Sequence, residues 1–227
     1  MVLLANTTLC AIVRDEMMNP AGGIQDFVDS VVPFVQRARI VDTGSLDGTR
    51  QYLEDAKKRY AHLDVLDHPF NGYAPSRNVS IQDVTTDWIL VLDADERLMP
   101  SDFEELGKER EFLPEAIAFS FDFLTVSPLD VNERVDISGN NPRFFSSRKN
   151  IFYDNLVFEI PCLRGDPVPR EKSKVKIKHF ISDARILKSK DWYEPLKRGD
   201  LPFATAPSSI PSFGQWKAYN PQREKYR

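Results

Sequence analysis

A short apolar run that ends in a group of acids constrains this sequence more than any other feature. Residues 89–92 read Ile-Leu-Val-Leu, and Asp93, Asp95 and Glu96 follow. A run of this length is typical of a buried strand, whereas ionised carboxylates are costly to bury without a cation or hydrogen bonds. We therefore expect a core strand whose end opens onto a cleft or a bound cation.

The first half of the chain alternates short apolar runs with amphipathic helical patterns. Strands are expected at residues 8–15, 38–42, 62–68 and 89–92. Helices are expected at about residues 24–32, from a cap at Asp47 onward, at 75–84 and at 100–107. Alternation of this kind is typical of βα units around a mostly parallel sheet. The sequence thus predicts the α/β fold class.

The second half predicts a smaller region of mixed or antiparallel strands. Residues 116–126 alternate and are rich in aromatic side chains, which favours strands. Residues 141–147, 151–155 and 173–182 have the character of further strands. From residue 201 onward, repeated prolines predict an irregular tail or a linker. We expect one domain over residues 1–200 and this tail over residues 201–227.

Composition excludes several partners. The 227 residues carry 30 Lys and Arg against 34 Asp and Glu, a formal net charge of −4, which gives no long-range attraction to nucleic acid or to an anionic membrane. No apolar run reaches the roughly 18 residues that a transmembrane helix needs. Cys10 and Cys162 are expected as buried thiols in a reducing compartment. We therefore expect a cytoplasmic location, with peripheral attachment to a membrane as the alternative.

Acids at the ends of two expected strands are the candidate chemical groups. Asp42 ends the second strand, and Asp93 and Asp95 follow the fourth. Ligands of open α/β sheets bind outside the carboxyl ends of the strands, where carboxylate oxygens suit Mg2+ or Mn2+ on a polyphosphate. For the Asp-x-Asp pair alone, a solvated turn before a helix is an equal alternative. The acid at the neighbouring strand end favours a shared site.

Three longer segments resemble the GT-A glycosyltransferases of family 2, which use nucleotide-sugar donors. They are LCAIVRDE (residues 9–16), IVDTGSLDGT (40–49) and APSRNVSIQDVTTDWILVLDADE (74–96), with weaker likeness in PRFF, LVFEIP and KIKHF. Their order and spacing match the family over about residues 8–180. The resemblance implies a GT-A fold in which residues 1–100 bind the nucleotide and residues 101–200 face the acceptor.

The resemblance also implies how the donor would be held. Ile12 and Arg14 would border the nucleotide base, and Asp42 would accept hydrogen bonds from the uracil or the ribose. Arg77 and Asn78 would face the diphosphate or the sugar. These five residues form the expected nucleotide-sugar site together with the acidic segment.

The acidic segment would hold the metal. Asp93, with Ala94 beside it, would contact the ribose or a metal-bound water. Asp95 would bind Mn2+ or Mg2+ between the two phosphates. The bound ion would assist departure of the nucleoside diphosphate. Many GT-A folds add a late histidine, which makes His179 a candidate ligand of the metal or the diphosphate. The alternative for His179 is a hydrogen-bonded structural histidine.

A carboxylate should act as the catalytic base, because family 2 enzymes invert the anomeric carbon while the acceptor hydroxyl loses its proton. Glu159 in LVFEIP is the expected base, although Phe158 stands where related sequences often carry histidine. Asp154 and Asp122 are the alternatives. Arg143 in PRFF matches a recurrent arginine that approaches the acceptor or the diphosphate.

The predicted function is metal-dependent, inverting transfer of a sugar from a nucleoside diphosphate sugar, with UDP favoured, to a hydroxyl of a glycan, lipid-linked or protein acceptor. A non-catalytic binding module of the same fold and a sugar nucleotidyltransferase are the alternatives. The loop RDEMMNPAGG lacks the glycine-rich basic character that a nucleotidyltransferase needs. A haloacid dehalogenase-like phosphatase would carry Asp-x-Asp on its first strand. The proline-rich tail is compatible with one domain of a larger glycosyltransferase.

Overall fold

Four parallel strands build the first half of a large sheet. The computed structural model describes residues 1–19, 23–127, 130–136, 141–155 and 159–180, so the expected tail and Phe158 lie outside the described residues. The four strands are β1 (Leu4–Val13), β2 (Val35–Asp42), β3 (Leu63–Asp67) and β4 (Trp88–Val91). In β1, Val13 pairs with Asp42 of β2 and Cys10 pairs with Val91 of β4. The carboxyl ends of these three strands are therefore neighbours.

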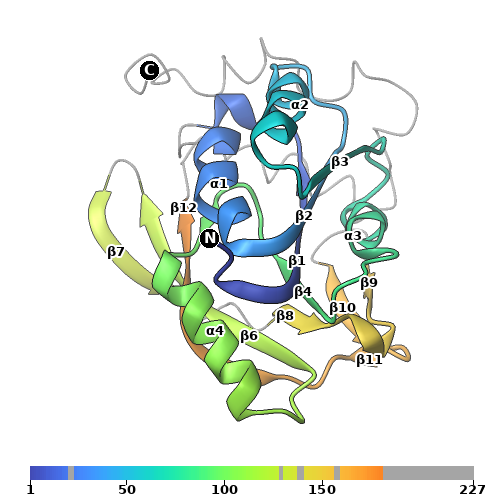
Figure 1. Cartoon of the computed structure of the whole chain (residues 1–227), viewed down its shortest axis with the longest axis vertical. Coiled ribbons are helices and arrows are strands. Elements are labelled where there is room, and N and C mark those ends of the chain that lie inside the picture. The colour runs from blue at the N-terminus through green and yellow to red at the C-terminus, as the bar shows by residue number, and fades with distance from the viewer. Residues whose placement is uncertain (20–22, 128–129, 137–140, 156–158, 181–227) are drawn as a thin grey trace.

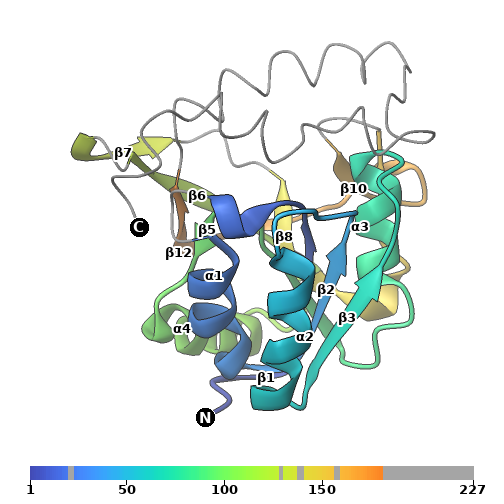
Figure 2. The ribbon, with the colours of Figure 1, turned by 90° about the horizontal axis from the view of Figure 1, so that it is seen from above.

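The second half adds strands in mixed directions. They are β5 (Glu96–Arg97), β6 (Ala118–Ser127), β7 (Asp130–Asp136), β8 (Pro142–Ser146) and β12 (Glu171–Phe180). The strand order of the described sheet is β3-β2-β1-β4-β8-β6-β12-β5, and β7 pairs with β6 (Figures 1 and 2). Residues 92–95 alone connect β4 to β5, although β8, β6 and β12 lie between them in the sheet. The sheet must therefore curl, which brings β12 back toward the end of β4.

A small second sheet lies beside the large one. It consists of β9 (Phe152–Asp154), β10 (Ile160–Leu163) and β11 (Asp166–Pro167). Short 3-10 helices lie at Glu16–Met18, Val32–Phe34 and Ser147–Lys149. The expected α/β class is confirmed, with a large, curled, mixed sheet.

Helices cover both faces of the large sheet. They are α1 (Gly23–Val31), α2 (Thr49–Arg59), α3 (Tyr73–Ile81) and α4 (Pro100–Phe112). Side chains alternate between the faces of a strand, so Leu9 and Ala11 of β1 join the core under α1, α2 and α4, whereas Cys10 joins the core under α3. Figures 1 and 2 show α3 beside the small sheet, away from α1 and α4.

Three local expectations were wrong. The third helix ends at Ile81, because Gln82 has extended backbone angles (φ −64°, ψ 139°), and Asp83 beyond it has a positive φ of 53°. The fourth helix continues past Gly107 to Phe112, since residues 108–112 include good helix formers. Gly48 (φ 100°), not Asp47, is the cap of α2, and Asp47 Oδ1 instead accepts from the N–H of Thr49 at 3.0 Å.

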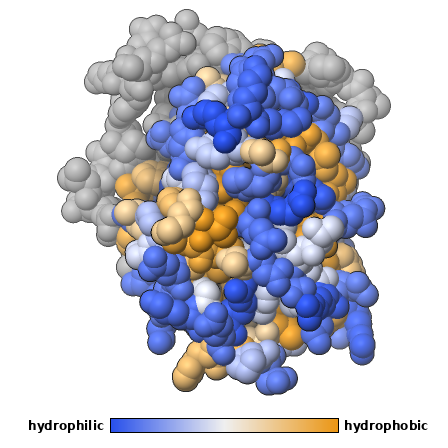
Figure 3. All heavy atoms as spheres, in the orientation of Figure 1, coloured by the Kyte–Doolittle hydropathy of each residue, from blue (hydrophilic) through white to orange (hydrophobic). Residues whose placement is uncertain are grey.

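The hydrophilic surface and the buried cysteines are those expected from the composition of the chain. The face in Figure 3 is mainly hydrophilic, with apolar atoms in smaller areas. No helix in the described part of the chain is long and apolar enough to cross a membrane. Cys10 and Cys162 are both buried, unpaired thiols, as expected.

Candidate active site

Asp42 at the end of β2 presents one bonded and one unbonded carboxylate oxygen. Its Oδ1 accepts from the N–H groups of Gly44 at 2.9 Å and Ser45 at 2.8 Å. Gly44 has φ 102°, a conformation that side chains other than glycine rarely adopt, so the turn depends on this glycine. Oδ2 is buried, and no described residue bonds to it. An acceptor of this kind is costly unless a ligand or water pairs with it.

Arg14 fixes the same turn from the end of β1. Its Nη1 donates to the carbonyl of Thr43 at 2.7 Å and its Nη2 to that of Gly44 at 2.9 Å. Ile12 lies two residues earlier, paired with Val41 across the sheet. The loops after β1 and β2 are also tied by Thr49 Oγ1, which accepts from the N–H of Glu16. Arg14 thus holds the loop that shapes the surroundings of Asp42.

Asp93, in the turn after β4, lies between two arginines. Arg77 of α3 donates from Nη2 to Oδ1, and Arg143 of β8 donates from Nη2 to Oδ2 at 3.1 Å. Burial alone would raise the pKa of Asp93, but the two guanidinium groups outweigh it and hold that pKa well below its usual range. Asp93 is therefore an anion whose two oxygens are already engaged.

Glu96 extends this network. Arg143 Nη2 donates to its Oε1 at 2.8 Å, and its Oε2 accepts from the N–H of Asp93 at 2.9 Å. The side chain is almost fully buried, and burial raises the pKa of Glu96 to about 7 although Arg143 opposes the shift. Sequence reasoning assigned no role to Glu96. The one sequence feature that could have suggested a role for Glu96 is its position directly after Asp93 and Asp95.

Glu159 joins the network through Arg77. The Nε of Arg77 donates to Glu159 Oε1 at 3.2 Å, and 16% of the glutamate side chain is exposed. The two alternative bases have other hydrogen-bond partners. Asp122 pairs with Lys172 at 2.5 Å, and Asp154 accepts from the N–H of Asn155 at 2.8 Å. Of the three carboxylates, Glu159 is the one that shares a partner with Asp93.

Asp95 and His179 form a separate pair at the same edge. The short strand β5 pairs with β12 so that His179 lies opposite Glu96, and Phe180 donates its N–H to the carbonyl of Asp95 at 2.8 Å. His179 Nε2 lies 3.5 Å from Asp95 Oδ2. Burial lowers the pKa of His179, but the hydrogen bond to Asp95 and the nearby acids outweigh it and raise that pKa.

The pair meets part of the requirement of a divalent cation. Within the described residues, no three His, Cys, Asp or Glu side chains gather closely enough to hold a metal by themselves. Asp93 already serves two arginines, which leaves Asp95 and His179 as the donor set. Mg2+ is commonly held by one or two carboxylates and completes its shell with phosphates and water. Asp95 is a donor of this kind for a cation that a diphosphate also ligates, and His179 lies beside it.

Arg97 holds the backbone of the acidic turn. Its Nη1 donates to the carbonyls of Ala94 at 2.6 Å and Glu96 at 2.8 Å, and its Nη2 donates to that of Gly23 at 2.9 Å. The guanidinium also lies over the rings of Phe27 and Phe180. Ala94 is buried here and its carbonyl is engaged in the turn.

Comparison with known proteins identifies the family. A family model described as glycosyl transferase family 2 matches residues 21–165. The chain belongs to this family. The expected family, fold class and enzyme class, a glycosyltransferase, are thereby confirmed.

Relatives of the family 2 chain include both sequences and structures. A TPR repeat-containing protein of Synechococcus elongatus is 36% identical over 120 residues, 52% of this chain and 27% of that protein. The crystal structure of S. aureus TarS in complex with UDP-GlcNAc has a TM-score of 0.55 at 13% identity and covers 83% of this chain and 63% of that one. The complex of TarS with UDP gives 0.54 at 13% identity, with 80% and 62% covered. This chain thus spans about a quarter of the curated relative and under two thirds of these structures.

The structure brings most of the predicted residues of this family 2 chain to one region. Arg77, Asp93, Glu159 and Arg143 are directly connected, and Asp95 and His179 adjoin them. Asn78 is engaged differently, because its side-chain amide bonds to the backbone of Tyr153 at both ends, with Oδ1 accepting at 2.7 Å and Nδ2 donating at 2.9 Å. The sequence analysis did not single out Tyr153, because no motif around this residue predicts its contact with Asn78.

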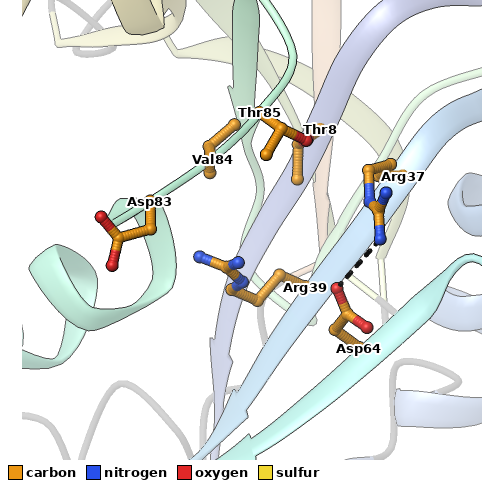
Figure 4. A pocket seen from close by; sticks show the side chains of 7 residues that line it. All are labelled: Thr8, Arg37, Arg39, Asp64, Asp83, Val84 and Thr85. Atoms are coloured by element: carbon orange, nitrogen blue, oxygen red, sulfur yellow. Dashed lines mark ion pairs between the residues drawn. The ribbon is translucent and has the colours of Figure 1, made fainter.

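A hollow elsewhere in the family 2 domain contains none of the predicted residues. It lies beside β1, β2 and β3 and is lined by residues that include Arg37, Arg39, Asp64 and Asp83 (Figure 4). Arg37 pairs there with Asp64 at 3.8 Å. Because the cationic and anionic side chains are equal in number, this hollow shows no preference for an anion.

Proposed function

We propose that this chain transfers a sugar from a nucleoside diphosphate sugar, with UDP as the nucleotide, to a hydroxyl of a glycan, lipid-linked or protein acceptor, with inversion. The observation that carries the proposal is Asp42 Oδ2, a buried acceptor without a partner among the described residues. A uracil N–H or a ribose hydroxyl would supply the missing donor. TarS, which shares the fold, is described with UDP and with UDP-GlcNAc, which supports this choice of nucleotide.

Asp95 and His179 are the proposed ligands of Mn2+ or Mg2+. When bound, such an ion offsets the negative charge that develops on the departing nucleoside diphosphate. Asp93 has a different proposed role, because its two oxygens are engaged by Arg77 and Arg143. It fixes both guanidinium groups at the edge where the donor would lie. Ile12 and Ala94 border the nucleotide site, and Arg14 shapes it through the hydrogen bonds of its guanidinium group to the carbonyls of Thr43 and Gly44.

Glu159 is the proposed catalytic base. An inverting transfer needs a carboxylate that takes the proton from the acceptor hydroxyl. The Glu159 side chain is partly exposed, and Arg77 Nε fixes one of its oxygens at 3.2 Å. Arg77 therefore connects the base to Asp93. Asn78 positions Tyr153 and β9 rather than the donor itself.

The setting of the domain follows from the same proposal. We propose a cytoplasmic location, with peripheral membrane attachment as the alternative, because the two buried thiols suit a reducing compartment. The curated relative carries a much longer chain, which supports a role as one domain of a larger glycosyltransferase. We also propose that residues 1–100 bind the nucleotide and that residues 101–200 face the acceptor.

The experiment that tests the function is UDP release from UDP-sugars with Mn2+ present. The parent should release UDP slowly by transfer to water and faster once a suitable acceptor is added. Glu159→Gln should lower release with acceptor by about 100-fold or more, whereas Asp154→Asn, a matched change at an alternative base, should retain it. Intact UDP-sugars with every donor and acceptor tried would contradict the proposal in favour of a binding module.

A further inference from the structure

Buried polar atoms that lack a hydrogen-bond partner in the protein are sites where a ligand or a water molecule can bind. Among the described residues these atoms belong to six side chains, namely Arg14, Arg39, Asp42, Arg77, Thr125 and Tyr153. Most buried polar groups in proteins are hydrogen-bonded, so each exception needs an explanation. The proposed function accounts for Asp42 and leaves Arg77 Nη1 and Tyr153 Oη without a role.

Tyr153 is fixed with its ring in the core. Asn78, next to Arg77 on α3, bonds to both the N–H and the carbonyl of Tyr153. The ring packs in the cluster under α3, with its centroid 6.3 Å from that of Phe145. Only 4% of the residue is exposed. The backbone and the ring are thus fully accounted for by the fold, and the hydroxyl is not.

The phenol of Tyr153 interacts electrostatically with the charged network. Burial raises the pKa of Tyr153, while the charges of Arg77 and Arg143 oppose that rise and those of Glu159 and Asp93 add to it. The charges of all four groups therefore act on the phenol, which stays protonated at neutral pH. The hydroxyl can donate one hydrogen bond and accept others.

Arg77 contributes the second unpartnered group. Its Nε bonds to Glu159 and its Nη2 to Asp93, while Nη1 is buried and has no partner among the described residues. Two carboxylates already balance the charge of this guanidinium. A phosphate would have to lie beside Asp93 and Glu159, which is unfavourable. The remaining N–H groups of Nη1 therefore suit an uncharged oxygen.

We propose that Tyr153 Oη and Arg77 Nη1 form a subsite that binds one hydroxyl group of the transferred sugar. A sugar hydroxyl can accept a hydrogen bond from the N–H of Arg77 Nη1 and can donate to, or accept from, the hydroxyl of Tyr153. A single sugar hydroxyl would therefore give Nη1 and Oη their missing partner. The subsite lies beside Glu159, the proposed base. The inference rests on the proposed function and adds to it a residue that selects the sugar, since sites built to bond a hydroxyl discriminate against donors that lack it.

The test compares Tyr153→Phe with the parent by calorimetry. UDP, UDP-glucose, UDP-galactose and UDP-GlcNAc are titrated with Mn2+ present. The parent should bind at least one UDP-sugar more tightly than UDP. Tyr153→Phe should weaken that UDP-sugar about 3- to 10-fold, the value of one hydrogen bond, and leave UDP unchanged. Tyr60→Phe, which removes a hydroxyl bonded to Asp29 at 3.1 Å, should bind every ligand as the parent does.

A melting temperature separates a subsite from a structural role. Because the hydroxyl has no partner in the described fold, Tyr153→Phe should melt at or above the temperature of the parent. A fall of several degrees would assign the hydroxyl to the fold and overturn the subsite.

The titration outcomes also separate the subsite from the proposed function. Unchanged affinities of Tyr153→Phe for all UDP-sugars, or a parent without any preference over UDP, would overturn the subsite alone. If the parent binds no uridine nucleotide, the choice of UDP fails, and the same comparison is made with GDP and dTDP and their sugars. Binding of none of them would overturn both proposals.

Discussion

Arg77 donates from Nε to Oε1 of Glu159 at 3.2 Å, although the two residues are 82 positions apart. Arg77 lies on α3, which packs on the parallel strands, and Glu159 directly precedes β10 of the small sheet. The bond therefore links the half of the chain that we assign to the nucleotide with the half that we assign to the acceptor. A buried arginine that also bonds Asp93 makes the two halves of the site depend on one side chain.

Loss of Arg77 should destabilise the fold. Arg77→Met leaves Asp93 and Glu159 without a shared counter-charge, and breaking a buried ion pair in this way costs roughly 3–5 kcal/mol of unfolding free energy. Arg77→Lys should cost less, because it keeps the charge but cannot bond both acids in the same geometry. Urea unfolding followed by circular dichroism measures both.

Arg59→Met is the matched control for Arg77, since Arg59 is half-exposed and pairs with Asp29 at 3.3 Å on the surface. It should leave the unfolding free energy close to that of the parent, because exposed ion pairs contribute little to stability. If Arg77→Met were as stable as Arg59→Met, the network would contribute nothing to the fold.

Arg97 should be needed to hold the acidic turn. It makes three hydrogen bonds to main-chain carbonyls and lies over two aromatic rings, with its guanidinium carbon 5.5 Å from the centroid of Phe27. A lysine cannot make these three hydrogen bonds in the same geometry, so Arg97→Lys should lower the unfolding free energy by about 1–3 kcal/mol. Arg148→Lys, at an exposed arginine, is the control, and equal stability of the two variants would refute this role.

The parallel half of the fold and the acid pair were predictable from the sequence. The apolar run before Asp93 gave the strand, and two neighbouring strands with terminal acids gave the edge where a site forms. Those inferences depend on local patterns, because βα units place sequential elements side by side. The end of the third helix was not predictable, since the extended backbone angles at Gln82 have no clear sequence signal.

The partners of the acids were less predictable. Arg143 reaches Asp93 from β8, an antiparallel strand inserted beside β4, and His179 reaches Asp95 through the pairing of β12 with β5. Both contacts depend on the order of strands in a curled sheet, which composition and periodicity do not determine. Tyr153 is positioned by Asn78 from another element, so its place also follows from tertiary contacts alone.

The proposed metal ligands predict how UDP affinity depends on Mn2+. The parent should bind UDP at least about tenfold more weakly in EDTA than in Mn2+, and both Asp95→Asn and His179→Ala should remove most of that difference. Calorimetry with and without EDTA measures it. His62→Ala is the control, because His62 Nε2 lies 2.9 Å from the carbonyl of Val32, away from the site. A Mn2+ dependence that survives Asp95→Asn would place the metal elsewhere.

The most direct test of the account is the titration of UDP into the parent and into Asp42→Asn with Mn2+ present. Asparagine keeps an oxygen for the N–H groups of Gly44 and Ser45 but replaces the unpartnered Oδ2 with an amide donor. The account predicts a roughly 10- to 100-fold loss of UDP affinity, the value of a hydrogen bond to a charged group. Asp47→Asn, in the same loop, should bind UDP as the parent does. Equal UDP affinity in the parent and Asp42→Asn would contradict the assignment of this edge as the nucleotide site.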